Sequence, residues 1–383
     1  MKVYRTQQYI RPDLQAHIHA RDMLDNVHKL RSLCPQRTRF CAVVKANAYG
    51  HGISEVVNIL NRAEVDAFAV ATFYEALHIA PLADGKPILI LEPVNPAWSA
   101  EQIRICAREG FECVPASPDA LHYMQDSLAD TSFVLRLHLD IETGMGRWGI
   151  APAQAGAMLS MIDDSGHLAA AGVFTHFATA DEEDLSYAYE QVERFERFLD
   201  RYNLKDRRDL AIHASNSAGT IKLPQAHYDM VRCGIAMYGY YPRRMADAPI
   251  QLKPVLRLEA PVAHLHHIPA GHSVSYGRSF VTTRPTRAAV IPLGYADGYR
   301  RCFSNCAKMK IGSHVVPVIG RVCMDQVILD VTDVPDVRAG QMVTVLDNDH
   351  DSPCSAYALA ALADTICYEM LTLIHAHVNR IVH

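Results

Sequence analysis

The sequence lacks the features that mark membrane, secreted and nucleic-acid-binding proteins. It contains no uninterrupted apolar run long enough to cross a membrane, and its first eight residues lack the apolar segment of a secretory signal. It has no long run of Lys or Arg, and its formal net charge is −5. A surface that binds nucleic acid or anionic lipid would need clustered positive charge. We therefore expect a cytoplasmic protein that acts on a small molecule, without nucleic acid or a membrane as partner.

Cysteine pairs and complete sets of metal ligands are absent as well. The ten cysteines include no C-x-x-C pair, so we expect reduced thiols that are mostly buried. The pattern His264-x-His266-His267 puts histidine side chains on one face of a strand, and His375-x-His377 puts two near the chain end, but no third ligand is apparent for either site. We predict that the protein has no metal site.

A regular alternation of strand and helix is present instead. The length of 383 residues, with 49% hydrophobic and 21% charged residues, is typical of a globular protein with two domains. Short runs rich in β-branched residues predict eight strands, at 40–46, 66–72, 87–92, 111–116, 132–140, 169–177, 209–216 and 230–238. Segments with helical character lie between most of them, at 53–63, 73–83, 97–109, 118–128, 151–164 and 184–203.

This alternation predicts an α/β fold whose first part is a (β/α)8 TIM barrel, with a doubly wound open sheet as the alternative. After about residue 250 the pattern changes to strands without long helices, at 255–268, 272–280, 287–294, 308–318, 326–331 and 341–347. Only 355–370 has helical character there. We predict a barrel domain over residues 10–245 and a mainly β C-terminal domain over residues 246–383.

Polar residues gather where the barrel strands would end, which is the face on which barrel enzymes carry their chemistry. Lys45 ends the first run, Arg147 follows the fifth, His176 ends the sixth, Ser217 follows the seventh and Arg232 lies in the eighth. Burial lowers the pKa of a lysine, which suits Schiff-base formation with a carbonyl compound. The Ser217 hydroxyl and the backbone after Arg232 offer donors to a phosphate. Pyridoxal phosphate meets both requirements.

Ordered motifs along nearly the whole chain resemble those of one enzyme family. AVVKANAYGHG at 42–52 resembles the cofactor-lysine motif of the alanine racemases, the fold-type-III pyridoxal-phosphate enzymes. Further matches are DIETGMGRWG at 140–149, THFATADE at 175–182, HASNSAG at 213–219, DMVRCGIAMYG at 229–239, SYGRSF at 275–280, LGYADG at 293–298, GRVCMDQ at 320–326 and CYEM at 367–370. The resemblance implies the family's barrel and C-terminal β domain, which residues 1–9 would join, and racemisation of L- and D-alanine that supplies D-alanine for peptidoglycan.

The resemblance also implies which residues bind the cofactor, pyridoxal 5'-phosphate. Lys45 would hold it covalently, Arg232 would contact its pyridine nitrogen, and Arg147 would lie near its phenolic oxygen. Because arginine keeps its proton, Arg232 would leave the ring a weakened electron sink, which limits side reactions such as transamination. The full cofactor-binding set is Lys45, Tyr49, Arg147, His176, Ser217, Arg232, Gly234, Ile235 and Tyr368.

The same resemblance implies a two-base mechanism, with Lys45 on one face of the cofactor and Tyr276 on the other. A phenol with its ordinary pKa near ~10 is a poor base, so His176, with Arg232 behind it, is expected to favour the phenolate. In the family this tyrosine comes from the partner subunit, which implies a head-to-tail homodimer with shared active sites. The substrate-binding set is Arg147, Met324, Tyr295 and Asp325, and Asp181, Arg301 and Arg321 would line an outer corridor.

One position departs from the family pattern. Many relatives carry a carbamylated lysine seven residues before the arginine that corresponds to Arg147, and this chain has Asp140 there. We hypothesise that Asp140 orients Arg147 directly or through water, without modification. Alternatives to alanine racemisation are a racemase of serine, lysine or broad specificity, a non-catalytic pyridoxal-phosphate carrier, and a fold-related decarboxylase.

Overall fold

The computed structural model describes residues 9–245 and 248–383, which divide into two compact units. The barrel unit comprises residues 24–46 and 56–252, and the β unit comprises residues 9–23, 47–55 and 253–383. Of the predicted domain limits, residue 246 and all but the last residue of 1–9 lie outside the described residues. The limits at 245 and 246 stay a prediction.

The barrel unit is a closed ring of eight parallel strands, which confirms the predicted barrel and excludes the open sheet. Chain order is also ring order, and β9 closes the ring on β2 with Arg232 opposite Cys41. The strands are β2 (Arg39–Val43), β3 (Ala67–Val70), β4 (Ile88–Ile90), β5 (Glu112–Cys113), β6 (Leu135–Asp140), β7 (Leu168–Phe174), β8 (Ala211–His213) and β9 (Met230–Cys233). All eight overlap the predicted runs, whose apolar character follows from burial on both faces of the ring.

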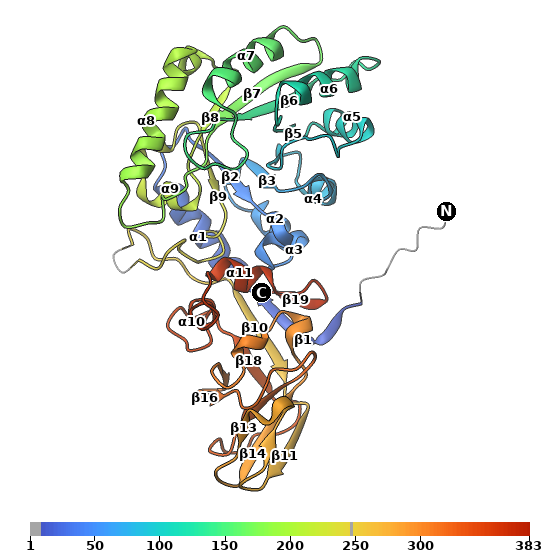
Figure 1. Cartoon of the computed structure of the whole chain (residues 1–383), viewed down its shortest axis with the longest axis vertical. Coiled ribbons are helices and arrows are strands. Elements are labelled where there is room, and N and C mark those ends of the chain that lie inside the picture. The colour runs from blue at the N-terminus through green and yellow to red at the C-terminus, as the bar shows by residue number, and fades with distance from the viewer. Residues whose placement is uncertain (1–8, 246–247) are drawn as a thin grey trace. The chain divides into compact units, whose positions relative to one another are not determined.

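Helices connect the strands of the ring, and α5 to α8 run along its outside (Figure 1). They are α3 (Ile53–Leu60), α4 (Phe73–Ile79), α5 (Ala100–Glu109), α6 (Pro118–Leu128), α7 (Pro152–Asp163), α8 (Ser186–Arg201) and α9 (Ser217–Lys222), with 3-10 turns at Ala80–Leu82, Leu204–Asp206 and Pro224–Ala226. Sequence analysis missed α1 (Ala20–Ser32), although its buried Met23, Val27 and Leu30 recur at helical spacing.

The β unit contains three sheets, in agreement with the predicted change of rhythm. The largest has the order β16-β15-β18-β10-β1-β19, and the others are β11-β14-β17 and β12-β13. The strands are β1 (Arg11–Ile18), β10 (Leu256–Pro261), β11 (His264–Ile268), β12 (Ser273–Val274), β13 (Phe280–Val281), β14 (Thr286–Ile291), β15 (Lys308–Ile311), β16 (His314–Pro317), β17 (Val327–Asp330), β18 (Met342–Leu346) and β19 (Val378–Val382). Its helices are α10 (Ala356–Leu362) and α11 (Cys367–Thr372), with 3-10 turns at Tyr276–Arg278, Tyr295–Asp297 and Arg301–Phe303.

Three further features bear on the expectations from sequence. All ten cysteines are free, and six of them are buried: Cys41, Cys106, Cys113, Cys233, Cys354 and Cys367. No helix within residues 9–245 and 248–383 combines the length and apolarity that a membrane crossing requires. In the same ranges, no group of three His, Cys, Asp or Glu side chains is arranged to hold a metal ion.

Candidate active site

Lys45 lies just past the carboxyl end of β2, at the mouth of the barrel. Burial lowers the pKa of its amine, and the nearby positive charge of Arg147 lowers it further, while Glu75 acts in the opposite direction. The amine forms no hydrogen bond or ion pair with any described residue. A half-buried amine of lowered pKa without a protein partner is suited to react with a carbonyl group.

The segment after Lys45 is a short left-handed helix, α2 (Lys45–Tyr49). Residues 46–49 all have φ near +53°, although none is glycine. This conformation costs about 1–2 kcal/mol per residue, so surrounding contacts must hold it. Within the barrel unit the Ala46 amide donates to Glu75 Oε1 at 2.6 Å, and within the β unit the Ile53 amide donates to Asn47 Oδ1 at 2.9 Å. Backbone held in so unfavourable a conformation is typical of functional sites.

Arg232, in β9, is almost fully buried inside the barrel mouth. Its Nη1 donates to His213 Nδ1 at 2.7 Å, and its Nη2 lies 2.9 Å from the Thr175 carbonyl, 3.1 Å from the Ala214 carbonyl and 3.4 Å from His176 Nδ1. The Phe174 ring lies 5.0 Å from the guanidinium carbon. These bonds orient the guanidinium and leave its Nε–H and one Nη1–H for acceptors other than the described protein groups.

Positive charge exceeds negative charge in this mouth. Burial lowers the pKa of His176 to about 3, with further lowering by Arg232, Arg147 and Lys45. Burial raises the pKa of Asp140 to about 7, and the same two arginines only partly offset it. Lys45, Arg147 and Arg232 therefore outnumber Glu75 and Glu142, the two carboxylates whose charges also act here, because Asp140 is only weakly ionised. Such an imbalance fits a ligand that brings its own negative charges, such as a phosphate or a carboxylate.

The direct contact between Asp140 and Arg147 that sequence analysis allowed is absent. The Asp140 carboxylate forms no hydrogen bond or ion pair with any described residue. Its negative charge acts on both arginines through space. Among the neighbouring groups that raise the pKa of Arg232, Asp140 has the largest effect. Asp140 is therefore an electrostatic neighbour of both guanidinium groups, and a water-mediated link to Arg147 stays a prediction.

The predicted phosphate-binding residues fall into two groups. In the barrel unit, the Ser217 hydroxyl oxygen accepts from the amides of Gly234 at 2.9 Å and Ala236 at 3.3 Å. Because both of these contacts use its oxygen, the hydroxyl proton stays available to an anion. The predicted Ile235 lies between these two amides. In the β unit, the rings of Tyr49 and Tyr368 lie 6.1 Å apart.

The remaining predicted residues lie in loops of the β unit. Tyr276 is 72% exposed and sits in a turn where Ser275, Gly277 and Arg278 all have positive φ. The Ser275 hydroxyl donates to the Arg321 carbonyl at 2.7 Å. A β-carbon at Gly277 would lie 3.0 Å from Arg321 Nε, so the turn and this arginine are in close contact. The turn therefore presents the Tyr276 ring outward.

A neighbouring turn brings Tyr295 and Met324 together. The Tyr295 amide donates to the Cys323 carbonyl at 3.1 Å, and the next amide donates to the Met324 carbonyl at 3.0 Å. A β-carbon at Gly294 would lie 2.2 Å from that carbonyl oxygen, so glycine permits this close approach. Since Cys323 also contacts Ser275 at 3.4 Å, the loops that carry Tyr276, Tyr295, Met324 and Asp325 are neighbours in the β unit.

Sequence analysis missed several buried polar residues behind Arg232. Glu112, His138 and His213 form a connected chain of hydrogen bonds inside the barrel. The HASNSAG motif contains His213, and His138 lies in a predicted strand, but neither was singled out. Single histidines within apolar runs carry no periodic signal, so only their spatial neighbours identify them.

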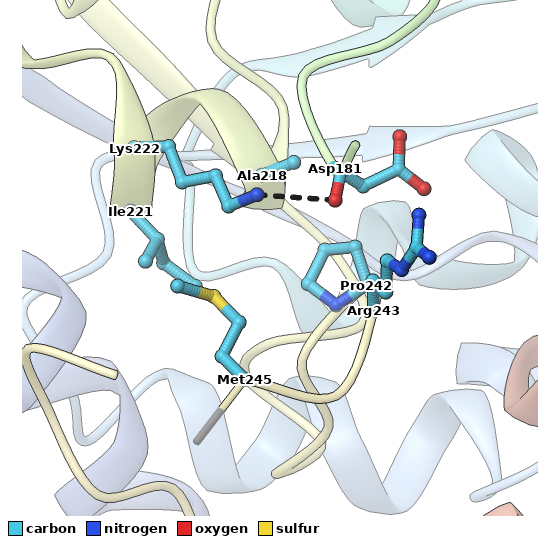
Figure 2. Close-up of a pocket in the computed structure, with 7 residues that line it drawn as sticks. All are labelled: Asp181, Ala218, Ile221, Lys222, Pro242, Arg243 and Met245. Atoms are coloured by element: carbon cyan, nitrogen blue, oxygen red, sulfur yellow. Dashed lines mark hydrogen bonds between the residues drawn. The ribbon is translucent and has the colours of Figure 1, made fainter. Parts of the chain in front are cut away.

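Asp181, predicted for an outer corridor, lines a separate small pocket of the barrel unit (Figure 2). The Lys222 amine donates to the Asp181 carbonyl at 3.1 Å there. Apolar side chains of Ala218, Ile221, Pro242 and Met245 line most of the rest, together with Arg243. The pocket has no room for a water molecule, so it is too small to hold a substrate. Arg301 begins a 3-10 turn of the β unit.

Comparison with known proteins gives a consistent result over the whole chain. Two family models match: "Alanine racemase, N-terminal domain" over residues 18–242 and "Alanine racemase, C-terminal domain" over residues 255–382. The alanine racemase of Halothermothrix orenii is 36% identical, over 93% of each chain. Alanine racemase 1 of Clostridium acetobutylicum is 34% identical, over 97% of this chain and 96% of that one.

Solved structures agree with these sequence matches. The alanine racemase of Bacillus anthracis with bound L-Ala-P has a TM-score of 0.89 and 30% identity, over 97% of this chain and 95% of that chain. A Clostridium difficile alanine racemase in complex with cycloserine has a TM-score of 0.87 and 27% identity, over 97% of this chain and 96% of that chain.

Proposed function

Because the chain belongs to the alanine racemase family, we propose that it interconverts L- and D-alanine with a bound pyridoxal phosphate, Lys45 and Tyr276. The single observation that carries this proposal is the mouth of the barrel. There Arg147 and Arg232 add positive charge near Lys45, whose amine has no protein partner. Alanine and the cofactor phosphate both carry the negative charge that this mouth requires.

When bound, pyridoxal phosphate supplies an electron-delocalising ring that makes the Cα proton of an attached amino acid acidic. Lys45 would hold the cofactor, and Ser217 with the backbone near Gly234 would donate to its phosphate, together with Tyr49 and Tyr368. Arg232 would face the pyridine nitrogen with its free Nε–H. A guanidinium that keeps its proton leaves that nitrogen unprotonated.

Proton transfer needs one group on each face of the planar carbon. Lys45 would take and return the proton on one face, aided by the lowered pKa of its amine. Tyr276 would do so on the other face, since its exposed ring is free to enter a site formed by another chain. His176, held neutral and bound to Arg232, would lie beside the phenol. Met324, Tyr295, Asp325 and Arg147 would bind the substrate.

A head-to-tail homodimer with shared active sites completes this proposal. The neighbouring side chains of Tyr276, Tyr295 and Met324 are 72%, 42% and 54% exposed. A cluster of large exposed residues is typical of a surface that meets a partner. We also propose a cytoplasmic location, where D-alanine would enter peptidoglycan synthesis.

The test is chiral chromatography after incubation of the cofactor-loaded protein with L-alanine, L-serine, L-lysine or L-arginine, each separately. We expect rapid formation of D-alanine and little D-product from the other three. Preferential conversion of serine or lysine would keep the mechanism and change the substrate. Release of CO2 would instead identify a decarboxylase, and no turnover of any substrate would identify a pyridoxal-phosphate carrier.

A further inference from the structure

A continuous chain of hydrogen bonds connects Arg232 to a carboxylate on the far side of the barrel interior. Arg232 Nη1 lies 2.7 Å from His213 Nδ1, and His213 Nε2 lies 2.8 Å from His138 Nδ1. His138 Nε2 lies 3.0 Å from Glu112 Oε2, and the other Glu112 oxygen accepts from Arg136 at 3.0 Å. The chain thus passes from β9 through β8 and β6 to β5.

The chemistry of its two ends fixes the direction of every bond in this chain. Arginine can only donate, so His213 Nδ1 must accept and its Nε2 must carry the proton. That proton is donated to His138 Nδ1, so His138 must carry its own proton on Nε2. This second proton then points at Glu112, and an ionised carboxylate can only accept. Only neutral histidines in the Nε2–H form satisfy all of these bonds.

The surroundings hold each member in its required state. Burial raises the pKa of the Glu112 carboxyl, but its hydrogen bonds from His138 and Arg136, together with the positive charge of Arg136, lower the pKa below its ordinary value. Burial and the adjacent Arg232 both lower the pKa of His213, which stays neutral. His138 and His213 are 1% and 0% exposed, so water cannot replace either partner.

Packing fixes the two rings in place. The Phe174 ring stacks on His213 with centroids 4.9 Å apart and an interplanar angle of 12°. A β-carbon at Gly172 would lie 2.3 Å from His138 Nδ1, so any other residue there would displace the ring from its bond to His213. Glycine is therefore required at this point of β7 for the chain of bonds to form.

We propose that Glu112 is a remote positioning residue for Arg232, acting through His138 and His213. Its carboxylate accepts the proton that His138 carries on Nε2. His138 Nδ1 therefore accepts from His213 Nε2–H, and His213 Nδ1 keeps the lone pair that accepts from Arg232. The guanidinium is thereby held by a hydrogen-bond acceptor on its inner side. This inference rests on the proposed role of Arg232 toward the cofactor. It deepens that role by assigning the group that sets its orientation.

The alternative is that Glu112 serves only as the ion-pair partner of Arg136, which is half exposed at the end of the chain. The two roles predict different effects of substitution. If Glu112 only pairs with Arg136, removal of either residue should have the same effect. If Glu112 positions Arg232, removal of Glu112 should lower activity and removal of Arg136 should not.

The test compares E112L, E112Q and R136M by ¹⁵N NMR of the histidine rings in cofactor-free protein and by kcat of the loaded enzyme. Wild type should show both histidines in the Nε2–H form. E112L leaves the His138 proton without an acceptor, so we expect a mixture of ring forms and a fall in kcat of about ten-fold or more, as for hydrogen-bond partners behind liganding histidines. E112Q keeps an acceptor oxygen without the charge, so it should retain both ring forms and lose severalfold in kcat. R136M should resemble wild type.

Wild-type ring signals and kcat in folded E112L would overturn the proposal, as would equal losses in R136M and E112L. If E112L does not fold, E112Q decides, because an unchanged kcat in E112Q contradicts a role for the charge. The NMR measurement does not depend on turnover. Correct ring forms in a protein that does not racemise alanine would therefore refute the proposed function and leave the hydrogen-bond chain intact.

Discussion

Burial and neighbouring charge decide the chemistry of single residues in the barrel mouth. At Lys45, burial and the charge of Arg147 lower the pKa of the amine against the opposing effect of Glu75, which increases the neutral fraction that attacks a carbonyl. At His176 both effects lower the pKa of the ring, so it stays neutral near neutral pH. At Asp140 they oppose each other, and burial prevails. Burial and neighbouring charge therefore give Lys45, His176 and Asp140 different protonation states, although all three lie in the same mouth.

Substitution of Lys45 tests its assignment directly. K45A should abolish racemisation, by at least about a thousand-fold, and should remove the covalent cofactor absorbance, because no other amine replaces it. K205A is the matched control, since Lys205 forms surface ion pairs with Glu196 and Asp200 and should keep both signals. A yellow, active K45A protein would contradict the assignment.

The raised pKa of Asp140 predicts a dependence of stability on pH. Its folded pKa of about 7 exceeds the ordinary value of 3.8, so the folded state binds the proton more tightly. The resulting stabilisation is complete below about pH 4 and is lost as the pH rises through 7, a change on the order of 4 kcal/mol. D140N should remove this slope.

Denaturant unfolding of wild type and D140N between pH 4 and pH 8 measures this effect. The free energy of unfolding of D140N relative to wild type should rise over this interval. Parallel curves for the two proteins would show that Asp140 titrates normally when folded.

At the scale of elements, the left-handed helix α2 begins at Lys45 and carries Tyr49. It is followed by Gly50 and Gly52, which also have positive φ. A β-carbon at Gly50 would lie 2.0 Å from the Leu371 carbonyl oxygen within the β unit. The strained turn is thus seated closely against α11, the helix that carries Tyr368.

G50A should therefore destabilise the protein by more than about 2 kcal/mol, from backbone strain and the clash together. G110A is the matched control, because Gly110 also has positive φ but its β-carbon would meet no atom within 4 Å. It should cost only about 1 kcal/mol. Equal shifts of the urea midpoint in the two variants would show that the contact with Leu371 is not tight.

The elements themselves were largely predictable, and the site's strained and buried parts were not. Buried parallel strands are apolar throughout, so the runs at 66–72 and 87–92 marked β3 and β4. The helix at 46–49 has no glycine to announce its positive φ. The family motifs were enough to predict the residues of the barrel mouth. The hydrogen bond between Glu112 and His138 could not be predicted, because it forms only when the barrel closes.

At the scale of the whole molecule, the proposed mechanism takes its two bases from two chains. The proposed second base, Tyr276, lies on the exposed surface of the β unit with Tyr295 and Met324 nearby. Lys45 and Arg232 lie in the barrel unit. If one chain supplies the lysine and its partner supplies the tyrosine, inactive variants should restore each other's function.

Mixing K45A with Y276F tests this sharing. Neither variant alone should racemise L-alanine, but a mixed dimer keeps one site with both bases. Random exchange of subunits should restore about a quarter of wild-type activity, because half the dimers are mixed and each has one intact site. No recovery after refolding of the mixture, with dimers present by light scattering, would place both bases in one chain.

The most direct test of two-base racemisation is incubation of the cofactor-loaded protein with L-alanine in D2O, followed by chiral separation and mass measurement. The account predicts D-alanine that carries deuterium at Cα from its first appearance, because the proton removed on one face is not the one delivered on the other. D-alanine that retains the original proton would contradict the two-base mechanism, and alanine that stays in the L form would contradict the function itself.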